Sequence, residues 1–195
     1  MISLIFLLIT ILTYSTVYPF SIFSNFVSDL GLGPYTTRIT FAIGGTLMAA
    51  SYMVYFLFLS RYIQRRGGHP KIIWIAFFFS LLYALNLILV CIVPFDPTNE
   101  LAYNIHILGA IFLFLGQAGG GILYGLSELN TKGISILMPL TSFISALLAG
   151  IFVFIFTVQS LTLTPYQVLT YLSEWSAVFG LILWTSIHGL YTLND

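Results

Sequence analysis

The sequence predicts an all-α, polytopic membrane protein, built as a bundle of six transmembrane helices with both termini in the cytoplasm. Only 6 % of the 195 residues are charged, whereas 59 % are hydrophobic. A water-soluble chain of this length could not cover its surface with so few charges. The apolar residues form long runs that do not alternate as the strands of a membrane barrel do. In lipid, such runs are expected to form helices, which satisfy their own backbone hydrogen bonds.

Six runs are close to the roughly 20 apolar residues that span a bilayer. We expect helices at about 2–20, 39–62, 71–93, 103–126, 134–158 and 167–191. The first run ends at Tyr18-Pro19-Phe20, and short loops separate the others. The loops leave no room for a separate soluble domain, so residues 1–195 are expected to form one transmembrane domain.

The basic residues predict the orientation. The loops after the second and fourth runs lie on the same side and hold five of the six basic residues: Arg61, Arg65, Arg66, Lys71 and Lys132. By the positive-inside rule this side is cytoplasmic. Both termini are then cytoplasmic too, and Arg38 faces the outer side. A second role for the basic cluster, contact with anionic lipid headgroups, stays open.

Small residues recur every four positions in three of the runs. The pattern is Gly45-x-x-x-Ala49 in the second run, Gly116-x-x-x-Gly120 and Gly121-x-x-x-Gly125 in the fourth, and Ser142-x-x-x-Ala146-x-x-x-Gly150 in the fifth. Such stripes let two helix backbones approach closely. We expect the fourth and fifth helices to form a tight hairpin, and a homodimer through one of the glycine-rich faces is an alternative use.

Polar side chains are expected to gather near the outer ends of the helices. The candidate binding residues are Ser28, Asp29, Arg38, His106, Glu174 and Trp175. Glu174 is the most informative, because it lies about two turns inside the last run. An unpaired carboxylate near the bilayer centre costs up to about 3 kcal/mol. We therefore expect Glu174 to have a partner, a water-filled cavity or a raised pKa. Arg38 and His106 are expected at a similar depth and are the natural partners.

Three interpretations of this group remain open. Glu174, Arg38 and Asp29 could form an ionic network that holds the helix ends together. Asp29, His106 and Glu174 could instead be the catalytic residues of an outer-leaflet lipid hydrolase, since carboxylates and imidazole act as general bases and zinc ligands. The third interpretation is a site that binds a lipid headgroup without chemistry. A single histidine on this side and the absence of ligand spacing predict no metal and no cofactor.

A transporter of a small solute or a lipid is a further alternative. It would need a continuous polar path, and the inner half offers few polar groups. His188 lies near the inner end of the last run and is expected to be an interfacial or packing residue. The aromatic residues fit an interfacial belt, and their pattern indicates no aromatic cage.

Three segments carry a family resemblance. They are Val27-Ser28-Asp29-Leu30-Gly31 with the following Pro34, Asn104-Ile-His106-Ile-Leu-Gly109-Ala110-Ile-Phe112, and Ser173-Glu174-Trp175 with Phe179-Gly180. Together they resemble the DRAM (damage-regulated autophagy modulator) family and its FRAG and SFK relatives, also six-helix membrane proteins. The resemblance implies membrane-lipid homeostasis: GPI-anchor lipid remodelling, phosphoinositide regulation or lysosome-linked autophagy. It also implies membrane lipids as partners and a modulator more than an enzyme. The zero net charge gives no indication of nucleic acid.

Overall fold

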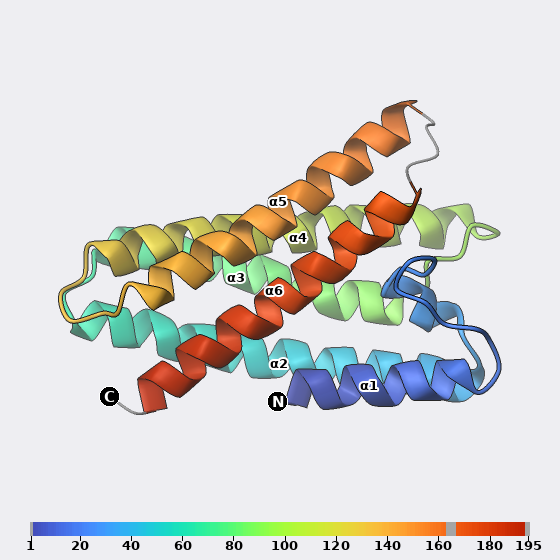
Figure 1. Ribbon diagram of the computed structural model, residues 1–195, viewed down its shortest axis with the longest axis horizontal. Helices are drawn as coiled ribbons and strands as arrows, with labels where there is room; N and C mark the ends of the chain where they lie inside the picture. Colours follow the sequence, from blue (N-terminus) through green and yellow to red (C-terminus); the bar gives the residue numbers. More distant parts are fainter. Residues whose placement is uncertain (1, 163–166, 194–195) are drawn as a thin grey trace.

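The computed structural model describes residues 2–162 and 167–193, and every regular element in these ranges is helical. The elements are α1 (Ile2–Ser15), the short 3-10 helix η1 (Ser28–Leu32), α2 (Tyr35–Arg65), α3 (Pro70–Ile92), α4 (Glu100–Leu129), α5 (Leu137–Thr162) and α6 (Gln167–Leu193). In Figure 1, α2, α3 and α4 follow the long axis of the molecule, while α5 and α6 slant across it.

Five of these helices, α2 to α6, are long and apolar enough to cross a membrane. The predicted all-helical architecture is therefore confirmed for the described residues, and five such helices are compatible with a multi-pass membrane protein; six spans are not confirmed. The structure ends α1 at Ser15, so the helix has 14 residues and is about 21 Å long, against a hydrocarbon core of about 30 Å. Pro19 explains the early end, because proline has no N–H to donate and disfavours helical geometry at the residue before it.

The first helix covers only part of the bundle. Figure 1 shows α1 beside α2, with its N-terminal end near the middle of the molecule. The side chains agree with this placement, since Ser3 Oγ lies 3.0 Å from the hydroxyl of Tyr52, in the middle of α2. The predicted cytoplasmic position of both termini is not confirmed.

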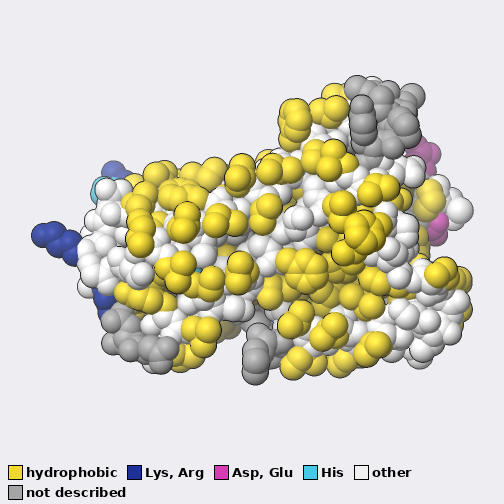
Figure 2. Space-filling view, viewed as in Figure 1, with side chains coloured by type: hydrophobic (Ala, Val, Ile, Leu, Met, Phe, Trp, Pro, Cys, Tyr) yellow, Lys and Arg dark blue, Asp and Glu magenta, His cyan; other side chains and the backbone are white. Residues whose placement is uncertain are grey.

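Most exposed charged side chains gather at the two ends of the bundle. Figure 2 shows Lys and Arg side chains at one end, Asp and Glu side chains at the other, and many hydrophobic side chains between them. We call the end with loops 66–69 and 130–136 the basic end, and the end with loops 16–34 and 93–99 the acidic end. Arg66 Nη1 donates to the carbonyl oxygen of Gly133 at 3.4 Å, which joins the two basic loops as their predicted common side requires.

The glycines of α4 pack against helices on both of its sides. A Cβ added at Gly116 would lie 2.6 Å from the backbone nitrogen of Tyr83 in α3. One added at Gly121 would lie 2.7 Å from the carbonyl oxygen of Ser142 in α5. The expected hairpin of α4 with α5 forms, and α3 approaches α4 just as closely. These contacts lie within one chain, and a homodimer stays a prediction.

Candidate functional site

The loop between α1 and α2 folds onto α6 at the acidic end. The backbone N–H of Val27 donates to Glu174 Oε2 at 2.8 Å. The next side chain along α6, Trp175, donates from Nε1 to the carbonyl oxygen of Asn25, also at 2.8 Å. The Trp175 side chain is buried, and Phe20 from the same loop packs edge-on against it. Two consecutive residues of α6 thus fix the loop in place.

Asp29 stabilises this loop from within. Its Oδ2 accepts a hydrogen bond from the backbone N–H of Phe26 at 2.8 Å, one turn before η1. Partial burial raises the pKa of the Asp29 carboxyl, and the hydrogen bonds from Phe26 and Asn25 oppose this rise. These contacts make Asp29 a residue that shapes the loop.

His106 of α4 connects the acidic ends of α3 and α4. Its Nδ1 lies 2.6 Å from the carbonyl oxygen of Val93, which follows the last residue of α3. A carbonyl oxygen can only accept, so Nδ1 carries the hydrogen. In the neutral ring, the other nitrogen, Nε2, is then an acceptor.

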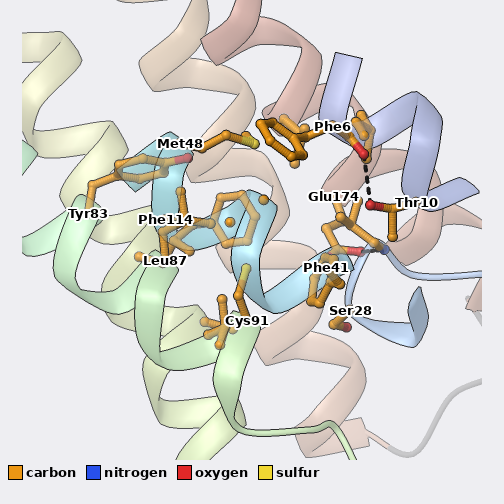
Figure 3. Close-up of a pocket in the computed structure, with 18 of the residues that line it drawn as sticks. Phe6, Thr10, Ser28, Phe41, Met48, Tyr83, Leu87, Cys91, Phe114 and Glu174 are labelled. Carbon is orange, nitrogen blue, oxygen red and sulfur yellow. Dashed lines mark hydrogen bonds between the residues drawn. The ribbon is translucent and has the colours of Figure 1, made fainter. Parts of the chain in front are cut away.

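A cavity of about 90 Å³ lies inside the bundle next to these residues. It is lined mostly by apolar side chains of α1, α2, α3, α4 and α6, and the polar residues on its wall include Thr10, Ser28, His106, Gln117 and Glu174. Figure 3 shows Thr10, Ser28 and Glu174 at one side of the cavity, and Tyr83 and Leu87 at the other. Thr10, Ser28 and Glu174 therefore lie together at one side of a mainly apolar cavity.

A second, smaller cavity of about 20 Å³ shares some of these polar residues. Ser28, His106, Ala110 and Glu174 line both cavities. The structure thus brings together three of the residues named from the sequence, from η1, α4 and α6. Asp29 lines neither of these two cavities, although its charge lies close enough to interact with that of Glu174.

Arg38 does not form the predicted ion pair with Glu174 or Asp29. Its side chain is exposed, and the one ion pair within the described ranges joins other residues. Its charge instead acts on Asp96, whose pKa is lowered mainly by hydrogen bonds from Thr98 and to a smaller extent by Arg38. The reason is helical phase: Thr37 points into the bundle, and the next residue is turned about 100° away from it.

A buried polar cluster at the basic end was missed from the sequence. Glu128 Oε1 of α4 lies 2.8 Å from His188 Nε2 of α6, and Ser142 Oγ of α5 donates to Glu128 Oε2 at 2.8 Å. All three side chains are at most 1 % exposed. Of the two roles expected for His188, the interfacial one is wrong and the packing one is confirmed: it is a buried residue with a carboxylate partner on α4.

One signal in the sequence could have revealed this cluster. Glu128 lies seven residues after Gly121, and residues seven apart share one face of a helix. Gly121 faces Ser142 of the small-residue stripe on α5. A glutamate on the packing face of α4 is directed at the neighbouring helix, even though it lies next to a loop.

The cluster is not arranged for nucleophilic catalysis. Ser142 Oγ is 3.3 Å from His188 Nε2, but the carboxylate of Glu128 contacts that same nitrogen. In a Ser–His–acid triad the acid holds the opposite nitrogen, and here the carbonyl oxygen of Trp184 lies 2.9 Å from Nδ1 instead. Within the described part of the chain, no three His, Cys, Asp or Glu residues are grouped to hold a metal ion. The cluster is best understood as a contact that joins α4, α5 and α6.

Comparison with known proteins corrects the family suggested by the sequence motifs. No curated protein and no solved structure matches this chain. The family model that matches differs from DRAM, FRAG and SFK, so the suggested membership is wrong, and the implied roles in GPI-anchor remodelling and autophagy lose their support. Two of the motif residues, Asp29 and Trp175, have a local role in this chain, since both hold the loop between α1 and α2. The match covers residues 1–189 and is described as "Protein of unknown function (DUF998)", so the chain belongs to the DUF998 family.

Proposed function

We propose that this protein is a multi-pass membrane protein that binds an amphipathic ligand, such as a membrane lipid, in the cavity at the acidic end. The observation that carries the proposal is the cavity itself, whose mainly apolar wall has Ser28, His106 and Glu174 together on it. Binding sites for small molecules share this composition: a mainly apolar wall and a few polar groups that fix the orientation of the ligand.

The size of the cavity limits what can enter. Its volume of about 90 Å³ is below the ~150 Å³ of an engineered apolar cavity that binds benzene. A small polar group with a few methylene groups therefore fits, and the rest of an amphipathic molecule must lie outside. The large hydrophobic side chains exposed along α2 to α6 are suited to contact lipid tails there.

We propose that the basic end faces the cytoplasm and that the cavity opens toward the outer half of the membrane. The support is the positive-inside rule, applied to basic loops that the Arg66–Gly133 contact places at one end. Cysteines placed at Lys132 and at Thr98, exposed in loops at the basic and acidic ends, test this orientation. In intact cells an impermeant maleimide should label only the Thr98→Cys variant. The native Cys91 is buried and should not react.

Photo-crosslinking tests the binding site itself. A lipid with a diazirine in its acyl chain should crosslink to cavity-lining peptides of the full-length protein purified in detergent. Ala110 lines both cavities, so Ala110→Leu should fill the space and remove these crosslinks. Ala50→Leu, which adds the same atoms at an exposed position of α2, is the matched control and should retain them. Equal crosslinking in all three proteins would contradict a ligand site in this cavity.

A further inference from the structure

We propose that the group bound in this cavity is an alkylammonium, held by the carboxylate of Glu174 between aromatic walls. This inference rests on the proposed function and adds the chemical class of the ligand. The observations behind it are a buried carboxylate without a cationic partner, acceptor atoms on the cavity wall, and four aromatic rings around the same space.

In the described part of the chain, no basic residue lies in position to balance Glu174 when it is ionised. The Glu174 side chain is 7 % exposed, and it accepts a hydrogen bond from the backbone N–H of Val27. Over residues 2–162 and 167–193, no Lys or Arg forms an ion pair with it, and Asp29 adds a second negative charge nearby. A buried charge is costly unless it is paired. A ligand that brings a positive charge would supply the missing partner.

The other polar atoms on the cavity wall are mainly acceptors. Gln117 Nε2 donates to Ser145 Oγ at 3.0 Å and to the carbonyl oxygen of Ala177 at 2.9 Å. These acceptors fix the orientation of the amide, and its Oε1 is left with no hydrogen-bond partner in the described part of the chain. Thr10 donates its only hydroxyl hydrogen to the carbonyl oxygen of Phe6. A ligand with N–H or O–H donors could therefore form hydrogen bonds with the cavity wall.

Aromatic rings from four different helices line the same cavity. They are Phe6 of α1, Phe41 of α2, Tyr83 of α3 and Phe114 of α4. Figure 3 shows Phe6 and Phe41 near Glu174, and Tyr83 at the opposite side of the cavity. The faces of aromatic rings attract cations, most strongly where water is excluded. Each helix contributes one ring, which is why no aromatic cage is visible in the linear sequence.

Other ligand classes fit less well. A carboxylate or phosphate would face Glu174 and Asp29, and among the described residues no Lys or Arg lines the cavity to receive it. A neutral alcohol could donate to Gln117 Oε1 but would leave the charge of Glu174 unmatched. An ammonium with N–H donors satisfies both needs. It can belong to a free amphipathic amine or to the headgroup of an amine-bearing lipid.

Three probes with the same ten-carbon chain test this inference. Binding of radiolabelled decylamine, decanol and decanoate is measured on the full-length protein in a neutral detergent. We expect decylamine to bind roughly 10- to 100-fold more tightly than decanol, the range expected for one hydrogen bond to a charged group, and decanoate to bind most weakly. Phosphatidylethanolamine that competes with decylamine would identify a lipid headgroup as the source of the ammonium. Decylamine binding without such competition would identify a free amine.

Glu174→Gln keeps the shape of the side chain and removes its charge, so it should abolish the preference for decylamine over decanol. Glu100→Gln makes the same change at an exposed position of the acidic end and should keep the preference. Equal affinities of decylamine and decanol for the wild-type protein would overturn the ammonium inference and leave the amphipathic site intact. Binding of none of the probes, together with absent lipid crosslinks, would refute both proposals. The wild-type ranking decides the inference even if Glu174→Gln does not fold.

Discussion

At Gly116 the backbone of α4 lies against the backbone of α3, and replacing this glycine by alanine tests that contact. The added Cβ would lie 2.6 Å from the backbone nitrogen of Tyr83 and 2.7 Å from the carbonyl oxygen of Phe79. Carbon contacts are optimal at about 3.5–4.0 Å, so the helices would have to separate by roughly 1 Å. Both neighbours are backbone atoms and cannot turn away as a side chain could.

Overpacking of a filled core costs about 1–3 kcal/mol, and a clash with backbone belongs at the upper end of that range. Alanine regains about 1 kcal/mol from its higher helix propensity. We therefore expect Gly116→Ala to lower the free energy of unfolding by about 2 kcal/mol. Tyr83 also lines the cavity, so ligand affinity should fall as well.

The assay is unfolding of the purified protein in mixed micelles with increasing dodecyl sulfate. Gly150→Ala in α5 is the matched control, because an added Cβ there has no atom within 4 Å in the described structure. The Gly150→Ala variant gains helix propensity without a clash, so its free energy of unfolding should be unchanged or up to about 1 kcal/mol higher than that of the wild-type protein. A Gly116→Ala protein as stable as Gly150→Ala would show that α3 and α4 do not pack as described.

Three further predictions concern the polar residues. Glu128→Gln should lower stability by about 3–5 kcal/mol, because it breaks a buried pair with His188; a loss below 1 kcal/mol in the same unfolding assay would argue against a charged pair. The pKa of Asp29 is raised in the folded protein, so its contribution to stability is complete below the unfolded value of about 3.9 and is lost as pH rises through the folded value. The melting temperature of the wild-type protein should therefore fall relative to Asp29→Asn from about pH 4 upward, and parallel curves would exclude this. Trp175→Phe removes the hydrogen bond to Asn25, worth about 0.5–1.5 kcal/mol, and should make loop 16–34 more sensitive to protease; unchanged cleavage would contradict its anchoring role.

The sequence predicted helices well and their ends poorly. Apolar runs show where a chain can cross lipid, but helices continue beyond the apolar part wherever backbone groups find partners. The run at 103–126 belongs to a helix that begins at Glu100, because the side chain of Asn99 accepts from the backbone N–H of Ala102. The run at 2–20 is the opposite case. It stays apolar beyond the end of α1, and local backbone chemistry at Pro19, rather than hydropathy, sets the end of the helix.

The sequence predicted correctly those site residues whose position depends only on their depth along a helix. His106 and Glu174 lie at similar depths from the acidic end and do line a common cavity. Rotation about the helix axis was harder to infer, and it directs Arg38 outward. The four aromatic rings of the cavity could not be assigned to one space before the arrangement of α1 to α4 was known.

The two buried glutamates at opposite ends of the bundle show how environment separates structural from functional carboxylates. Glu128 and Glu174 are buried to a similar degree. Glu128 has its partners inside the protein, with His188 on one oxygen and Ser142 on the other. Glu174 has one backbone donor on Oε2 and lies on the wall of an aromatic cavity. Replacing Glu128 by Gln therefore removes a contact made entirely within the protein, so it should lower the free energy of unfolding. Replacing Glu174 by Gln changes the wall of the proposed ligand cavity, so it should change which ligands the protein prefers.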